Sequence, residues 1–206
     1  MYTMKKTIIY FTMMVLSSMM IAQTVTIGTQ VWMTKNLDVV NFRNGDPIPE
    51  AKTNEEWLKA GDNKQPAWCY YDNDTANGTK YGKLYNWYAV NDPRVLAPTG
   101  YHVPTDAEWT KLSDYLGNDA GTKMKSTSGW FENGNGSNES GFNGLPGGGR
   151  SYYGMFHDQG GLGYWWSASE NNSGYAFSRS LTCGFDFLVR SNYFKEKGFS
   201  VRCLRD

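Results

Sequence analysis

The composition of the chain predicts a single loop-rich domain of the α+β or all-β class. Glycine accounts for 23 of the 206 residues, and aromatic side chains make up 16% of the chain. Only short segments have the apolar spacing of a helix, and several others alternate as strands do. No internal repeat or linker marks a second domain, and a chain of this length can bury one sizeable core.

The N-terminal segment, residues 1–22, has the pattern of a secretory signal peptide. Lys5 and Lys6 precede an uncharged apolar run that ends at Ala22 and is shorter than the roughly 20 residues of a membrane span. We therefore expect cleavage after Ala22 and export to the periplasm, the cell surface or the extracellular space. The mature domain would span residues 23–206. An uncleaved N-terminal anchor is the alternative. No later stretch is apolar enough to cross a membrane.

The charge pattern argues against nucleic acid as a partner. Twenty basic residues balance twenty acidic residues, so the formal net charge is zero. Proteins that bind polynucleotides usually carry a basic stripe, whereas the basic residues here form only short groups such as Lys195-Glu196-Lys197.

Alternating apolar residues predict an N-terminal hairpin, with strands at Val25–Ile27 and Gln30–Met33 joined by the turn Gly28-Thr29. Later strands are expected at short runs of apolar and aromatic residues. These runs are Trp68–Tyr71, Tyr164–Ala168, Ala176–Thr182, Phe185–Arg190 and Phe199–Leu204.

Two capping boxes predict the starts of two helices. They are Thr53-Asn54-Glu55-Glu56 and Thr105-Asp106-Ala107-Glu108. The first helix is expected to end at Gly61, and the second, which has one apolar face, at Gly117. A further short helix is expected at Tyr85–Val90, although its aromatic content also permits a strand.

The stretch from Ser126 to Gly163 is rich in glycine, serine and asparagine. Such a segment cannot build its own core, so it is expected to form long surface loops. The aromatic residues expected to be exposed there are Trp130, Phe131, Tyr152, Tyr153 and Phe156.

No metal or cofactor site is expected. The segment Asp72–Gly78 is rich in oxygen ligands, as calcium loops are, but the twelfth position counted from Asp72 is Lys83 rather than glutamate. We interpret the segment as a solvated polar turn. The two histidines and three cysteines do not cluster, which argues against a zinc site.

The motifs of common enzymes are also missing from the sequence. The glycine-rich segment Gly144–Arg150 lacks the Lys-Ser/Thr ending of a phosphate loop, and no GxSxG motif occurs. Asp106 and Glu108 belong to a capping box, where carboxylates favour the helix N-terminus. His102 is interpreted as a structural histidine. The sequence therefore predicts a protein without enzymatic activity.

Seven ordered blocks of the sequence resemble the Fibrobacter succinogenes major paralogous domain family, over nearly all of the mature chain. The blocks are Gly28–Leu37, Cys69–Asp74, Tyr81–Val90, Ala97–Trp109, Leu145–Arg150, Gly163–Glu170 and Gly198–Cys203. The block Gly100–Trp109 is also similar to the sulfatase-modifying, formylglycine-generating group. That similarity implies an α+β, C-type-lectin-like fold with two short helices, irregular antiparallel sheets and long loops.

The same similarities imply activities whose residues the chain lacks. Formylglycine-generating enzymes use two closely spaced cysteines near the C-terminus, whereas Cys183 and Cys203 lie far apart. Calcium-dependent lectins use Glu-Pro-Asn or Gln-Pro-Asp followed by Trp-Asn-Asp, and only Glu170-Asn171-Asn172 is distantly similar. Neither mechanism is expected here.

The three cysteines allow at most one disulfide within the chain. Cys69 and Cys203 lie on strand-like segments of blocks that resemble the family, whereas Cys183 begins a Cys-Gly turn. We expect a Cys69–Cys203 disulfide with Cys183 unpaired, in keeping with an exported protein.

These observations favour an exported, non-catalytic binding module for carbohydrate or another cell-surface ligand. The alternatives are a structural component of an envelope assembly and an unrecognised enzyme related to the sulfatase-modifying group. Aromatic rings pack on apolar sugar faces, while amides and carboxylates bind hydroxyls. Because adjacent strand residues point to opposite faces, at least one of Trp165 and Trp166 is expected to be buried. The candidate ligand-binding residues are Arg150, Tyr152, Tyr153, Trp165, Trp166, Glu170 and Asn171.

Overall fold

The computed structural model describes residues 23–206. The predicted signal peptide, residues 1–22, lies outside the described residues. None of the helices in the described part of the chain has the length and hydropathy that a membrane crossing requires.

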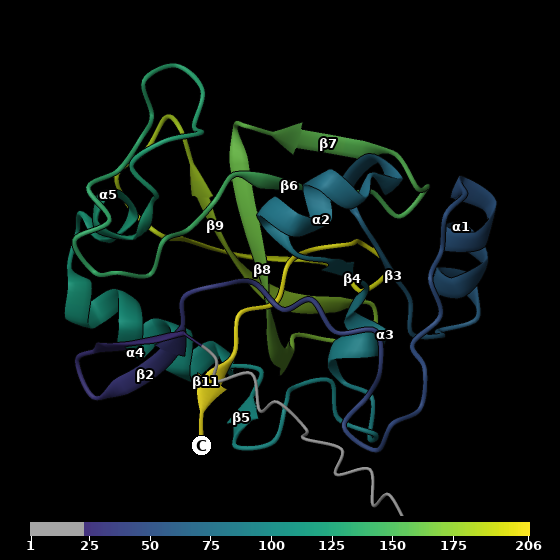
Figure 1. The fold of residues 1–206 in the computed structure, drawn as a ribbon. Coiled ribbons are helices and arrows are strands. Elements are labelled where there is room, and N and C mark those ends of the chain that lie inside the picture. Colours follow the sequence, from purple (N-terminus) through teal and green to yellow (C-terminus); the bar gives the residue numbers. More distant parts are fainter. Residues whose placement is uncertain (1–22) are drawn as a thin grey trace, which may run out of the picture.

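The N-terminal hairpin is present as predicted and belongs to a four-stranded antiparallel sheet. Strands β1 (Thr24–Ile27) and β2 (Gln30–Met33) pair with each other, β2 also pairs with β11 (Leu204–Arg205), and β11 pairs with β5 (Tyr101–His102). Figure 1 shows β2, β11 and β5 side by side next to a long helix. The sheet therefore joins segments from the start, the middle and the end of the described chain.

A five-stranded sheet forms the centre of the molecule (Figure 1). Its order is β10-β9-β8-β6-β7, and only the β6–β8 pair is parallel. The strands are β6 (Gly147–Arg150), β7 (Phe156–Gln159), β8 (Leu162–Glu170), β9 (Tyr175–Thr182) and β10 (Val189–Phe194). A short pair, β3 (Trp68–Cys69) and β4 (Leu84–Tyr85), forms a separate two-stranded sheet.

The helices are short. They are α1 (Asn54–Asp62), the 3-10 helix η1 (Tyr71–Asn73), α2 (Thr75–Tyr81), α3 (Trp87–Val90), α4 (Asp106–Leu116) and α5 (Ala120–Met124). Helices and mixed sheets together make this an α+β structure, which decides between the two classes that the composition left open.

Both predicted capping boxes are confirmed, at Thr53 for α1 and at Thr105 for α4, and α4 ends at Gly117 as expected. The predicted end of α1 at Gly61 is wrong, because the helix continues to Asp62. Gly61 instead allows close packing, since a Cβ there would lie 2.9 Å from the Glu196 side chain.

The predicted polar turn at Asp72–Gly78 is also wrong, because η1 and α2 occupy it. Asp74 is the N-cap of α2, and its carboxylate accepts a hydrogen bond of 2.8 Å from the backbone of Ala76. The helix predicted at Tyr85–Val90 begins two residues later than expected, at Trp87. Asn86 caps α3, and Tyr85 belongs to β4.

The stretch 126–163, predicted to be surface loop, contributes to the core. It contains β6, β7 and the start of β8. Trp130 is 5% exposed and Phe142 is completely buried. Phe142 contacts Trp32 and Trp165 edge-on, with ring centroids 5.8 and 5.7 Å away. Trp130 and Phe142 are therefore packed in the core, whereas Phe131 and Tyr153 of the same segment are exposed, as predicted.

Two later strands have different bounds from those predicted. The first four residues of the run Phe185–Arg190 are irregular, with a bend at Asp186 and Phe187, and β10 begins at Val189. The run Phe199–Leu204 forms isolated bridges at Phe199 and Ser200, and regular strand begins only at Leu204.

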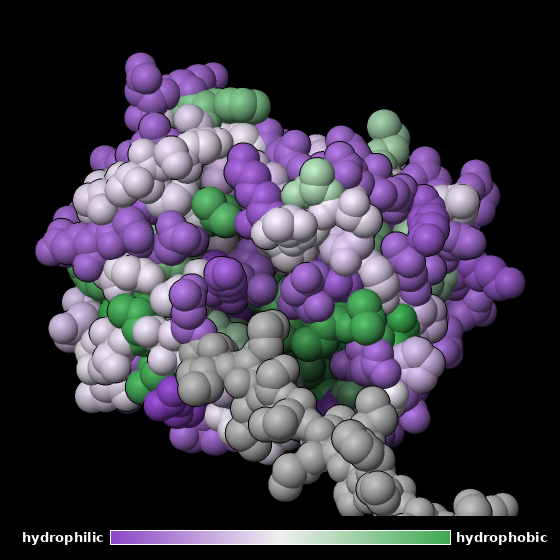
Figure 2. Space-filling view, in the orientation of Figure 1, coloured by the Kyte–Doolittle hydropathy of each residue, from purple (hydrophilic) through white to green (hydrophobic). Residues whose placement is uncertain are grey.

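The buried apolar residues form three clusters, two of which lie on opposite faces of β8. Trp166 belongs to the first cluster, with Trp87 and Phe199. Trp165 belongs to the second, beneath α4. The third lies around Trp57 on α1. Because both faces of β8 are covered, this strand lies in the interior of the domain. Figure 2 shows a mainly hydrophilic face with small, separate hydrophobic patches.

Candidate functional site

Arg150 is completely buried, so its predicted contact with a ligand is wrong. Its guanidinium donates hydrogen bonds of 2.7 to 2.9 Å to the backbone carbonyls of Ala51, Thr53 and Gly154. The rings of Trp57 and Phe156 lie 4.8 and 4.7 Å from it. Arg150 thus connects the β6–β7 loop to the start of α1, which lie next to each other (Figure 1).

Trp165 and Trp166 are both completely buried, so neither lies in a surface site. The Trp165 indole donates to the side chain of Asn36, and the Trp166 indole donates to the carbonyl of Tyr85, each at 2.8 Å. The expectation that at least one of them is buried is confirmed. The other is buried as well because clusters cover both faces of β8.

The remaining candidate residues lie around a chain of four surface aromatic rings, which we call the aromatic row. Tyr153, Tyr152, Phe194 and Tyr175 follow one another with ring centroids 3.6, 5.5 and 4.4 Å apart. Tyr153 is 56% exposed and Phe194 is 40% exposed. The row joins the β6–β7 loop to the edge strand β10 and its neighbour β9.

Polar groups lie at the Tyr175 end of the aromatic row. Asn171 is exposed, and its backbone N–H donates to the carbonyl of Tyr175 at 2.9 Å. Glu170 pairs with Lys195, the residue after Phe194, at 2.7 Å. The sequence prediction missed Phe194 and Tyr175. Because alternate residues of β10 are exposed, the period of two along this strand could have indicated that Phe194 is exposed. The strand register that pairs Phe194 with Tyr175 cannot be predicted from the local sequence.

The predicted Cys69–Cys203 disulfide is not formed, because all three cysteines are free thiols. Cys69 belongs to the cluster around Trp57, and Cys203 belongs to the cluster around Trp166. Burial raises the pKa of both thiols to about 12. They act as small apolar core residues.

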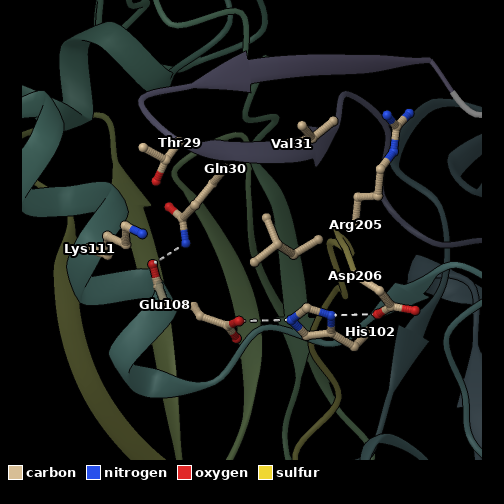
Figure 3. Close-up of a pocket in the computed structure, with 9 residues that line it drawn as sticks. Thr29, Gln30, Val31, His102, Glu108, Lys111, Arg205 and Asp206 are labelled. Atoms are coloured by element: carbon tan, nitrogen blue, oxygen red, sulfur yellow. Dashed lines mark hydrogen bonds and ion pairs between the residues drawn. The ribbon is translucent and has the colours of Figure 1, made fainter.

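A groove lies between α4 and the β1–β2 hairpin, and we call it the α4 groove (Figure 3). It consists of two adjoining cavities of about 340 and 400 Å³ that share Thr29, Gln30 and Lys111. The first also contacts Val31, His102, Glu108, Leu204, Arg205 and Asp206, and the second contacts Ile27, Gly28 and Tyr115.

His102 holds two carboxylates at one end of the α4 groove. Its Nε2 lies 2.9 Å from Glu108 and its Nδ1 lies 2.8 Å from Asp206. Partial burial of the imidazole opposes its protonation, but the hydrogen bonds to Asp206 and Glu108 outweigh this, so the pKa of His102 is raised. Burial opposes ionisation of Glu108, while hydrogen bonds from Thr105 and His102 outweigh it and lower the pKa of Glu108.

Among residues 23–206, no three histidine, cysteine, aspartate or glutamate side chains gather as a metal site would require. Two surface features of the described residues combine aromatic or apolar side chains with polar groups. One is the aromatic row with its polar edge, and the other is the α4 groove.

The fold and these surfaces define an α+β domain with solvent-exposed aromatic and charged side chains placed on a fully packed core. The family model of the Fibrobacter succinogenes major domain matches residues 25–205. The chain therefore belongs to the Fibrobacter succinogenes major domain family, which confirms the resemblance seen in the seven sequence blocks. No match was found among curated proteins or among solved structures.

Proposed function

We propose that the protein is an exported, non-catalytic binding module of C-type-lectin-like fold that binds carbohydrate through the aromatic row. The observation that carries the proposal is the continuity of four aromatic rings on the surface, from Tyr153 to Tyr175. Export is supported by the lysine-flanked apolar run before Gln23.

The chemistry of the aromatic row suits a sugar. Aromatic faces cover the apolar face of a pyranose, and adjacent amide and carboxylate groups bind its hydroxyls. Asn171 and the Glu170–Lys195 pair supply such groups beside Tyr175 and Phe194. A row of rings, rather than a single ring, fits several units of an extended polysaccharide.

The charged groups in the described residues support a binding role better than a catalytic one. The carboxylate of Glu108 accepts hydrogen bonds from the Thr105 backbone and from His102, so it already has partners. Asp106 is held by Arg179 and Arg190 at 2.7 and 2.9 Å. Both carboxylates thus stabilise α4 and its neighbours.

The test compares Phe194→Ala and Tyr153→Ala with the parent protein, on a glycan array and on polysaccharide from whole cells. Each ring loss is expected to weaken binding about tenfold, which corresponds to about 1.4 kcal/mol of contact energy.

The matched control is Phe185→Ala. Phe185 is 54% exposed and stacks on Phe187, with ring centroids 5.1 Å apart, but it lies outside the aromatic row. Its binding should equal that of the parent. The proposal fails if no glycan binds to the folded parent protein, or if the control loses as much affinity as the row variants. The first outcome would favour a structural role in an envelope assembly.

A further inference from the structure

The α4 groove shares no residue with the aromatic row, so it is a candidate for a second binding site. Its two cavities have volumes of about 340 and 400 Å³, which lie within the range of small-molecule sites. They run along one face of α4, from Glu108 through Lys111 to Tyr115.

Two cations of the α4 groove lie outside its ion pairs. At one end, the single imidazole of His102 contacts the carboxylates of both Glu108 and Asp206. Lys111 and Arg205 form no ion pair with any residue from 23 to 206. Figure 3 shows Lys111 reaching from α4 toward Gln30, while the guanidinium of Arg205 lies beyond Val31. Lys111 is therefore the cation that a ligand in the middle of the groove meets.

Next to this cation lies an exposed aromatic ring. Tyr115 follows Lys111 by four residues, so both lie on the same face of α4. The tyrosine is 66% exposed, and its ring rests on Gly28 at the turn of the hairpin. Gly28 has φ +61°, and a Cβ there would lie 3.0 Å from the Tyr115 ring. Glycine thus provides both the turn and the space for the ring.

Neutral polar groups complete the site. The amide nitrogen of Gln30 donates to the carbonyl of Glu108 at 3.0 Å, which fixes the side chain and leaves its oxygen as an acceptor. Thr29 adds an exposed hydroxyl. A cation, a ring face and neutral hydrogen-bonding groups match a ligand that has a carboxylate, an apolar ring face and hydroxyls.

We infer that the α4 groove binds an acidic saccharide built from uronic acid units. The carboxylate pairs with Lys111, the sugar ring packs on Tyr115, and the hydroxyls bind Thr29 and Gln30. This second site would make the protein bivalent toward a polysaccharide that carries both neutral and acidic units.

The test is a calorimetric titration of the protein with a trimer of galacturonic acid. The methyl ester of the same trimer is the matched ligand control, because it keeps the rings and hydroxyls but carries no charge. Lys111→Gln is expected to weaken binding about tenfold or more, since a hydrogen bond to a charged group is lost. Tyr115→Ala is expected to weaken it several-fold.

Two control variants make the outcome specific. Lys59→Gln removes an exposed lysine from the last turn of α1, far from the groove in sequence, and should bind as the parent does. Phe194→Ala changes only the aromatic row and should also bind the trimer normally, so failure of one site does not affect the other. Three outcomes would each overturn the inference. They are equal binding of the acid and its ester, equal losses of affinity in the Lys59 and Lys111 variants, and no saturable binding.

Discussion

Both ring nitrogens of His102 face a carboxylate oxygen, and only the imidazolium form can donate to both at once. His102 lies on β5, Glu108 on α4, and Asp206 directly after β11. In its protonated form, the ring connects three elements through charge-assisted hydrogen bonds. The sequence pointed to a structural histidine, and the geometry agrees, although its partner Asp206 could not have been identified from spacing.

The first prediction is that stability depends on the charge of His102. Its pKa is raised in the folded protein, so the stabilisation is complete below the unfolded pKa of about 6.5 and is lost as pH rises through the folded pKa. We expect the melting temperature to fall as pH rises above 6.5. In His102→Gln this part of the pH dependence should be missing. Parallel pH profiles of the parent and the variant would contradict the prediction.

For three residues, the prediction of ligand binding was wrong because their side-chain types occur both at binding surfaces and in cores. Arg150, Trp165 and Trp166 carry large polar or amphipathic side chains, which are common at binding surfaces and also occur in cores. Their carbonyl and amide partners come from distant segments, as Ala51 does for Arg150. The local sequence around each residue contains no signal that identifies these partners.

At the level of elements, the local signals were the reliable ones. The capping boxes at Thr53 and Thr105 and the glycine turn of the first hairpin are each complete within a few residues, and each is confirmed. Errors arose where a distant contact decides the outcome. Gly61 lies within α1 and packs against Glu196, so the helix does not end there. Likewise, β6 is a strand because it pairs with β7 and β8.

The second prediction concerns the start of α4. The Thr105 hydroxyl accepts a hydrogen bond from the Glu108 backbone at 3.2 Å, while the Glu108 carboxylate accepts one from the Thr105 backbone at 2.8 Å. Thr105→Ala should therefore lower the free energy of unfolding by about 1 kcal/mol. Thr105→Ser keeps the hydroxyl and should change it little. Urea denaturation measures both values, and equal losses in the two variants would show that the cap is not responsible.

At the scale of the whole molecule, the composition explains why the domain is full of turns and yet tightly packed. Its many glycines allow close approach between segments, while tryptophans fill the space between them. Trp32 and Trp109, for example, meet with ring centroids 4.7 Å apart beneath α4. The composition narrowed the fold to two classes, but it did not indicate how the three clusters divide the aromatic residues.

The third prediction is that export removes residues 1–22. Mass spectrometry of the protein from the periplasm or medium of an expressing bacterium should find Gln23 as the first residue. Leu16→Arg interrupts the apolar run and should leave uncleaved protein in the cytoplasm. Thr3→Arg, which lies before the run, is the control and should be exported. Exported protein that begins at Met1 would indicate an uncleaved anchor instead.

The position of β11 between β2 and β5 also determines when the protein can fold. Leu204 pairs with Trp32 on one side and with His102 on the other, so the four-stranded sheet cannot close until β11 has been synthesised. Contacts between segments so far apart in sequence form slowly, because a long loop must close first. The four-stranded sheet would therefore stay open until residues 204–205 leave the ribosome. For the export proposed above, this delay keeps the sheet unpaired, as passage through a translocation channel requires.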